Sequence, residues 1–134
     1  MLIPMFCLIL LTFLVGVKLV TARIASVKNQ QVSIKYYRYN SGEEEVPEIL
    51  IKTGKNFSNL LETPLLFYIA CTLYISLNVE NLLGIALAWI YVAVRCIHSY
   101  IHLSSNNVVY RMYAFLASFA CILFLWINLM VSQL

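Results

Sequence analysis

Three residues suited to acid–base or anion-binding chemistry lie on one stripe of an otherwise apolar segment. Arg95, His98 and His102 occupy positions i, i+3 and i+7, so in a helix they fall within about 60° of one face. The segment that carries them, 82–103, is long enough to cross a bilayer. A charged side chain there costs at least a few kcal/mol, and such residues usually face a bundle interior or a wet cavity. The stripe therefore marks a candidate functional site.

A second polar stripe lies earlier in the chain, where Lys55, Asn59 and Glu62 are spaced i, i+4 and i+7. Glu62 should lie about two turns inside the bilayer, where a carboxylate is expected to be paired or protonated. Arg95, Arg111 or a histidine could pair with it. Arginine guanidinium groups bind carboxylates bidentately, and Glu62 could bind an ammonium group. The set suits a small, mostly anionic ligand that carries one ammonium.

Four other interpretations stay open at this stage. Glu62 and Arg95 could form a buried ion pair that only fixes helix packing. His98 and His102 have the i, i+4 spacing of helical zinc ligands, with Glu62 as a third ligand, although the cations Arg95 and Arg111 would disfavour a metal. Either histidine could also be a plain polar residue at the membrane interface. A bundle that handles protons or ions is the remaining possibility.

The composition indicates which elements must position these residues. The chain is 62% hydrophobic and 11% charged, more apolar than a soluble domain of 134 residues can bury. We predict an all-α, integral membrane four-helix bundle in a single domain. Its helices are predicted at about 1–27, 55–79, 82–103 and 107–131, with a cytoplasmic loop at about 28–54. The glutamate run 43–45 is expected in a solvated part of that loop.

Segment 1–27 is interpreted as a retained helix rather than a cleaved signal peptide, because no basic region precedes its apolar run. The cysteines occur singly, without C-x-x-C spacing, and are expected to be small core residues rather than disulfide partners or zinc ligands. They are Cys7, Cys71, Cys96 and Cys121. The net charge of +3 is too small to suggest nucleic-acid binding.

Positive charge is concentrated in and beside the first connection, whereas the second connection, around Glu80, has none. The positive-inside rule then places the first connection in the cytoplasm and both termini outside. All the strongly polar membrane residues would lie in the same leaflet. The short chain without a targeting peptide favours a bacterial inner membrane. The basic residues concerned are Arg23, Lys28, Lys35, Arg38, Lys52 and Lys55.

Several motifs resemble one known family. Segment 55–62, KNFSNLLE, resembles the R-x-x-x-N-x-x-E motif that opens the second helix in the MAPEG family, the membrane-associated proteins of eicosanoid and glutathione metabolism. Arg95-x-x-His98, with Arg111 sixteen residues after Arg95, is also similar to that family. So is Thr21-Ala22-Arg23 at the end of the first segment. The resemblance covers nearly the whole chain.

The resemblance implies a homotrimer with glutathione bound between neighbouring subunits at the cytoplasmic side. Glu62 would contact the glutamyl amine, and Arg111 would be the catalytic residue near the thiol, where a cation favours the nucleophilic thiolate. A hydrophobic small-molecule substrate would arrive from the membrane lipid. By position, the glutathione-binding residues would be Arg23, Lys55, Asn59, Glu62, Arg95, His98 and His102.

The chain also departs from the family's pattern. Lys55 replaces the motif arginine, so the bidentate grip is lost there. His102 stands where some members have tyrosine, Met112 stands where certain members have a hydroxyl that activates the thiol, and Phe115 removes a tyrosine hydroxyl one turn later. Most of the motif residues are retained, whereas side-chain hydroxyls that would help to activate the glutathione thiol are missing.

The sequence therefore favours a glutathione-dependent membrane transferase or peroxidase that conjugates or reduces hydrophobic electrophiles. The alternative is a non-catalytic membrane subunit of the same type, which would bind another anionic ligand or a partner membrane protein. Whether the chain is an enzyme stays open, with glutathione transferase chemistry preferred.

Overall fold

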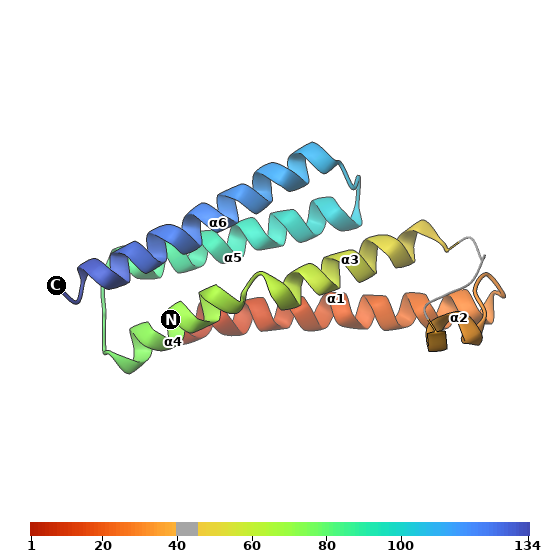
Figure 1. Ribbon diagram of the computed structural model, residues 1–134, viewed down its shortest axis with the longest axis horizontal. Coiled ribbons are helices and arrows are strands. Elements are labelled where there is room, and N and C mark those ends of the chain that lie inside the picture. Colours follow the sequence, from red (N-terminus) through yellow and green to blue (C-terminus); the bar gives the residue numbers. More distant parts are fainter. Residues whose placement is uncertain (40–45) are drawn as a thin grey trace.

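The computed structural model describes residues 1–39 and 46–134, so the predicted loop position of 43–45 lies outside the described residues (Figure 1). The described part is helical and contains no strand. In chain order its helices are α1 (Leu2–Lys28), α2 (Ile34–Tyr39), α3 (Glu48–Glu62), α4 (Leu65–Ser76), α5 (Leu82–Leu103) and α6 (Val108–Val131).

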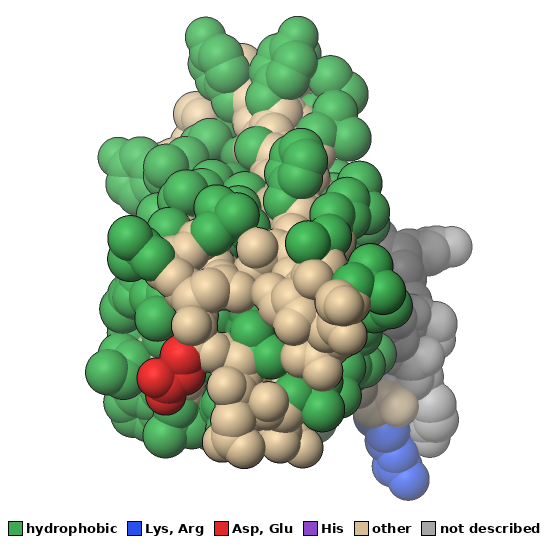
Figure 2. All heavy atoms as spheres, turned by 90° about the vertical axis from the view of Figure 1, so that its left-hand side faces the viewer, with side chains coloured by type: hydrophobic (Ala, Val, Ile, Leu, Met, Phe, Trp, Pro, Cys, Tyr) green, Lys and Arg blue, Asp and Glu red, His purple; other side chains and the backbone are tan. Residues whose placement is uncertain are grey.

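Four segments of the described chain are long and apolar enough to cross a membrane, which confirms the predicted all-α membrane bundle. They are α1, the combined segment Glu48–Ser76, α5 and α6. Viewed from the end toward which both termini lie, hydrophobic side chains cover the flanks of the bundle, as expected for surfaces in contact with lipid (Figure 2).

The second span differs from the predicted helix at 55–79, because it consists of two helices separated by a break at Thr63 and Pro64. Proline has no backbone N–H, and its ring clashes with the preceding turn, so a helix usually breaks or bends there. The Thr63 backbone N–H and hydroxyl both donate to the carbonyl of Asn59, at 3.1 and 2.6 Å. Pro64 cannot donate to the carbonyl of Leu60, the next acceptor along the helix. Glu62 is therefore the last residue of α3.

The range 28–54, predicted as a loop, is partly helical in the structure. It includes α2 and the first turns of α3. α3 begins at Glu48, directly after Pro47, which is the N-cap residue. A carboxylate in the first turn interacts favourably with the helix dipole. Glu48 also pairs with Lys52 at 2.7 Å, one turn later.

Two antiparallel packings organise the bundle. α5 packs along α6 and α1 packs along α3, while α3 also contacts α5. The centre of the core holds stacked aromatic rings, with the centroids of Phe67 and Tyr91 4.4 Å apart. The end of α1, the start of α3 and the turn between α5 and α6 lie at one end of the bundle (Figure 1). All the candidate polar residues therefore belong to neighbouring helices, and most belong to this end.

Close packing beside α5 gives a first testable prediction. A Cβ atom added at Gly84 would lie 2.8 Å from Cε1 of the buried Tyr74 and 2.9 Å from Oδ1 of Asn81, which caps α5. We expect Gly84→Ala to lower the free energy of unfolding by about 1–3 kcal/mol, the usual effect of overpacking. Thermal and denaturant unfolding of the purified chain in detergent, followed by circular dichroism, measures this.

Gly54→Ala is the matched control, because nothing lies within 4 Å of the added Cβ at that position. Alanine is favoured over glycine in a helix interior, so this substitution should leave stability unchanged or raise it by up to about 1 kcal/mol. Equal destabilisation by Gly84→Ala and Gly54→Ala would contradict the packing described for α4 and α5.

Candidate functional site

The stripe on α5 faces the protein interior. Arg95, His98 and His102 are 0%, 3% and 2% exposed, so the periodicity correctly predicts a shared buried face. The rings of His98 and His102 have centroids 5.8 Å apart, and the ring of Phe115 on α6 is 6.3 Å from His98. The stripe is thus enclosed by protein and does not face lipid.

Three hydrogen bonds connect α3 to α5 at this stripe and beside it. Arg95 Nη2 donates to Oδ1 of Asn59 at 2.5 Å and to the Asn59 carbonyl at 3.3 Å. One turn earlier in α3 and one turn later in α5, Asn56 Nδ2 donates to Ser99 Oγ at 2.6 Å. The Asn59 carbonyl belongs to the C-terminal turn of α3, where a cation is stabilising. Arg95 therefore fixes the orientation of Asn59.

Asn56 and Ser99 are part of this arrangement and were not predicted from the sequence. Asn56 is fully buried and Ser99 is 2% exposed. Their signal in the sequence is their spacing, since Asn56 lies three residues before Asn59 and Ser99 lies four residues after Arg95. Each is on the same helix face as its neighbour, as residues three or four apart must be.

The buried stripe has hydrogen-bonding groups without a partner. In the described part of the chain these include Nε and Nη1 of Arg95, Nδ1 of His98, Nδ1 of His102 and Nε of Arg111. Arg111 is half-buried and donates through Nη1 to Oδ1 of Asn106 at 2.7 Å. Buried polar groups are normally satisfied, so the unpaired guanidinium nitrogens of Arg95 and Arg111 could each donate to a further acceptor.

Glu62 is not that acceptor. It is exposed, and within residues 1–39 and 46–134 it forms no ion pair with Arg95, Arg111 or either histidine. The interpretation of a buried Glu62–Arg95 ion pair is therefore not supported within one chain. The described residues also contain no group of three or more metal-ligating side chains.

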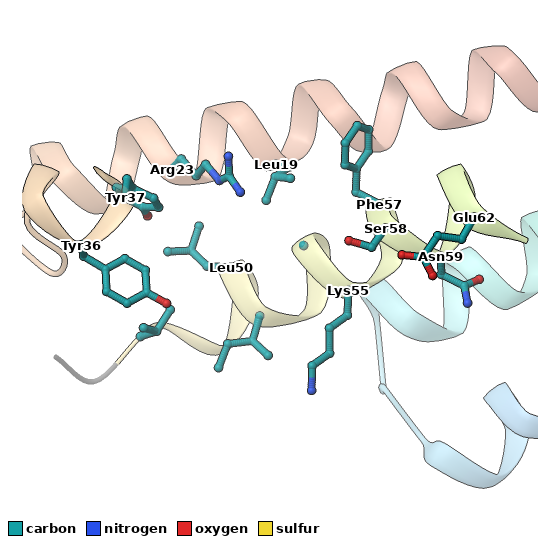
Figure 3. Close-up of a pocket in the computed structure, with 13 residues that line it drawn as sticks. Leu19, Arg23, Tyr36, Tyr37, Leu50, Lys55, Phe57, Ser58, Asn59 and Glu62 are labelled. Carbon is teal, nitrogen blue, oxygen red and sulfur yellow. The ribbon is translucent and has the colours of Figure 1, made fainter. Parts of the chain in front are cut away.

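A polar cleft of about 590 Å³ opens between α1, α2 and α3 (Figure 3). Four of the predicted site residues line it, one from α1 and three from α3. They are Arg23, Lys55, Asn59 and Glu62. Tyr36 and Tyr37 of α2 line it as well.

The cleft wall formed by α2 is fixed to α1. The hydroxyls of Ser26 and Tyr37 are 2.8 Å apart, and the guanidinium carbon of Arg23 lies 5.7 Å from the centroid of the Tyr37 ring. A cation over an aromatic face is attracted by the ring quadrupole. Arg23 is thereby held at the opening of the cleft while its donors remain available.

An apolar groove of about 510 Å³ lies beside the polar cleft. The two cavities share Phe57 as a lining residue. Gly16 of α1 makes room for this ring, since an added Cβ would lie 3.0 Å from Phe57 Cε2. The arrangement places a lipid-compatible surface next to a charged one, separated by a single aromatic side chain.

The predicted site residues thus fall into two connected groups. Arg23, Lys55, Asn59 and Glu62 line the cleft, and Arg95 joins them through its bonds to Asn59. The remaining three do not line the cleft of the same chain, because they lie on α5 and α6. These are His98, His102 and Arg111.

The role of Arg95 gives a second prediction. Arg95→Lys should lower the free energy of unfolding by about 1–3 kcal/mol, because Arg95 is fully buried and an ammonium there cannot reproduce both bonds to Asn59. Arg23→Lys is the control, since Arg23 is exposed and a lysine can keep the contact with the Tyr37 ring. Chemical unfolding of both variants in detergent tests this. Similar stabilities for the two would contradict a structural role for Arg95.

The comparisons with known proteins agree with this geometry. No curated protein and no solved structure matches the chain. The model of the MAPEG family matches residues 1–131. Members of that family commonly use glutathione. Membership therefore supports a transferase-like or peroxidase-like function related to glutathione, or a related function in the membrane. The match extends over all four spans and both groups of polar residues, and the chain therefore belongs to the MAPEG family.

Proposed function

We propose that the protein is an integral membrane glutathione-dependent transferase, with peroxidase activity on suitable substrates. It would use the glutathione thiolate to conjugate or reduce hydrophobic electrophiles that reach it from the bilayer. The observation that carries the proposal is the combination of unpaired guanidinium nitrogens on Arg95 and Arg111 with a polar cleft that holds one carboxylate.

The chemistry of the cleft fits glutathione, which has two carboxylates, one ammonium and one thiol. Arg23 and Lys55 would bind the carboxylates, and Glu62 would bind the glutamyl ammonium. Asn59, oriented by Arg95, would donate through its amide nitrogen. The volume of about 590 Å³ lies within the range of small-molecule sites.

Arg111 would promote the reaction. A free thiol titrates near 8.5, and a nearby guanidinium favours the thiolate at neutral pH. In conjugation, the thiolate sulfur attacks an electrophilic carbon of the acceptor, a thioether forms and the leaving group departs with its electron pair. The apolar groove beside Phe57 would hold the acceptor within reach of the cleft.

We further propose a homotrimer in which glutathione binds between subunits. The separation of Arg111, His98 and His102 from the cleft of their own chain supports this, because a neighbouring copy would bring the two groups together. The basic residues near α2 support a cytoplasmic first connection with both termini outside. Labelling of a Gln30→Cys variant in sealed cells should then require permeabilisation.

A non-catalytic binding protein or membrane subunit is the second candidate. The observation that favours it is Phe115, which lies against His98 and brings no hydroxyl to the buried stripe. Met112 of the same helix is likewise without a hydroxyl. A chain that binds glutathione without activating it would have this composition.

A conjugation assay separates the two candidates. The purified chain in detergent is incubated with glutathione and a generic aryl halide, and thioether formation is followed by absorbance. The transferase proposal expects a rate that is first order in protein and saturates with glutathione. Saturable binding without any rate above the uncatalysed reaction would favour the binding protein.

A further inference from the structure

A second groove lies on the other side of Arg23 and Tyr37, between α1 and α2. Its volume is about 430 Å³. Ile24, Val27 and Ile34 form its apolar surface, and Arg23 and Lys28 are at its edge. Ile24 and Ile34 are 62% and 73% exposed, so the groove presents hydrocarbon to its surroundings.

The length of α1 places this groove at the membrane surface. α1 has 27 residues, which span about 40 Å, whereas the hydrocarbon core is about 30 Å thick. The last turns of α1, which carry Lys28, therefore extend to the headgroup level. α2 follows after a short turn and lies beside the end of α1 (Figure 1). An apolar groove at that level borders both acyl chains and headgroups.

The charge on the described residues of the segment that forms the groove, 1–39, has one sign. Residues 1–39 contain five Lys or Arg residues and no Asp or Glu. Lys28 and Lys35 make no hydrogen bond or ion pair within the described ranges. Basic clusters directly beyond a membrane helix attract anionic lipid headgroups by about 1 kcal/mol for each cation near the surface.

The groove is also preformed. The backbone N–H groups of Gln31 and Val32 both donate to the carbonyl of Ser26, and Val32 is 2% exposed. The bond between the hydroxyls of Ser26 and Tyr37 adds a second attachment. α2 is thus held against α1 without help from a ligand.

We propose that this groove binds a phospholipid with an anionic headgroup. The phosphate and headgroup would be held by Lys28 and Lys35, and one acyl chain would lie along Ile24, Val27 and Ile34. This site differs from the glutathione cleft in its residues and its ligand, except for the shared wall of Arg23 and Tyr37. The proposal does not depend on the proposed catalytic function.

Native mass spectrometry of the full chain in mixed micelles tests it. Detergent containing equal amounts of phosphatidylglycerol and phosphatidylcholine is used, and the retained lipid is identified. We expect selective retention of phosphatidylglycerol. The double variant Lys28→Gln/Lys35→Gln should bind it about 30-fold more weakly, since each cation near the surface contributes about fivefold.

Lys52→Gln is the control for loss of a basic side chain at this end of the bundle, because it removes one charge from a lysine already paired with Glu48. Ile24→Trp provides an independent test, since it fills the groove without a change in charge and should reduce retention of the lipid. Equal retention of the two phospholipids would overturn the proposal, and so would undiminished retention by the double variant. Displacement of the lipid by millimolar inorganic phosphate would also overturn it, because it would indicate a site for free anions.

Discussion

Glu62→Gln should weaken glutathione binding by about 10–100-fold. The substitution keeps the shape of the side chain and removes its charge. A hydrogen bond to a charged group contributes about 1.5–3 kcal/mol, and the glutamyl ammonium would lose its counter-ion. Equilibrium dialysis with radiolabelled glutathione measures the dissociation constants of the variant and the parent chain.

Glu48→Gln is the control for this prediction. Glu48 is on the same helix and is also exposed, but it pairs with Lys52 and does not line the cleft. Its replacement should leave glutathione affinity within about twofold, as is usual for surface substitutions. If Glu62→Gln and Glu48→Gln weaken glutathione binding equally, the effect comes from the loss of negative charge in general. The assigned role of Glu62 is then wrong.

Arg111→Ala should lower the conjugation rate by about 10²–10³-fold while it changes glutathione affinity much less. Removal of one preorganised donor at a developing charge usually has an effect of this size on turnover. Arg111→Lys should retain part of the rate, because it keeps the charge and loses the planar donors. Initial rates at saturating glutathione give the comparison.

The pH dependence of the rate distinguishes thiol activation from a loss of folding. Without the guanidinium, glutathione must ionise near its free pKa of about 8.5. The rate of Arg111→Ala should therefore keep rising through pH 8.5, whereas the parent chain should reach its plateau at lower pH. A variant whose rate is reduced by the same factor at every pH would contradict the assignment of Arg111 to the thiol.

The sequence predicted the elements whose pattern is continuous. α5 has the predicted bounds 82–103, and its buried face follows directly from the spacing of Arg95, His98 and His102. The N-cap of α6 was also predictable, because Asn107 accepts from the N–H groups of Val109 and Tyr110. Periodicity and capping depend on residues that are close together in the sequence, so both can be recognised from a single sequence.

Other features depend on contacts between helices. The break at Pro64 interrupts a run whose hydropathy is uniform, and membrane helices often tolerate proline. The Asn56–Ser99 bond requires the relative rotation of α3 and α5, which no spacing within either helix specifies. The same rotation places Glu62 in the wall of the cleft and Arg95 in the protein interior. The two residues belong to polar stripes of similar spacing, so the spacing alone does not distinguish them.

A calorimetric titration of the purified full chain with glutathione tests the central claim most directly. The account predicts saturable heat with a dissociation constant below the millimolar range, since two carboxylates and one ammonium each find an opposite charge in the site. It also predicts that the dissociation constant of Glu62→Gln is about 10–100-fold higher, so that the heat at the same glutathione concentrations is strongly reduced. The absence of binding heat at millimolar glutathione, in a chain that remains helical by circular dichroism, would contradict the account.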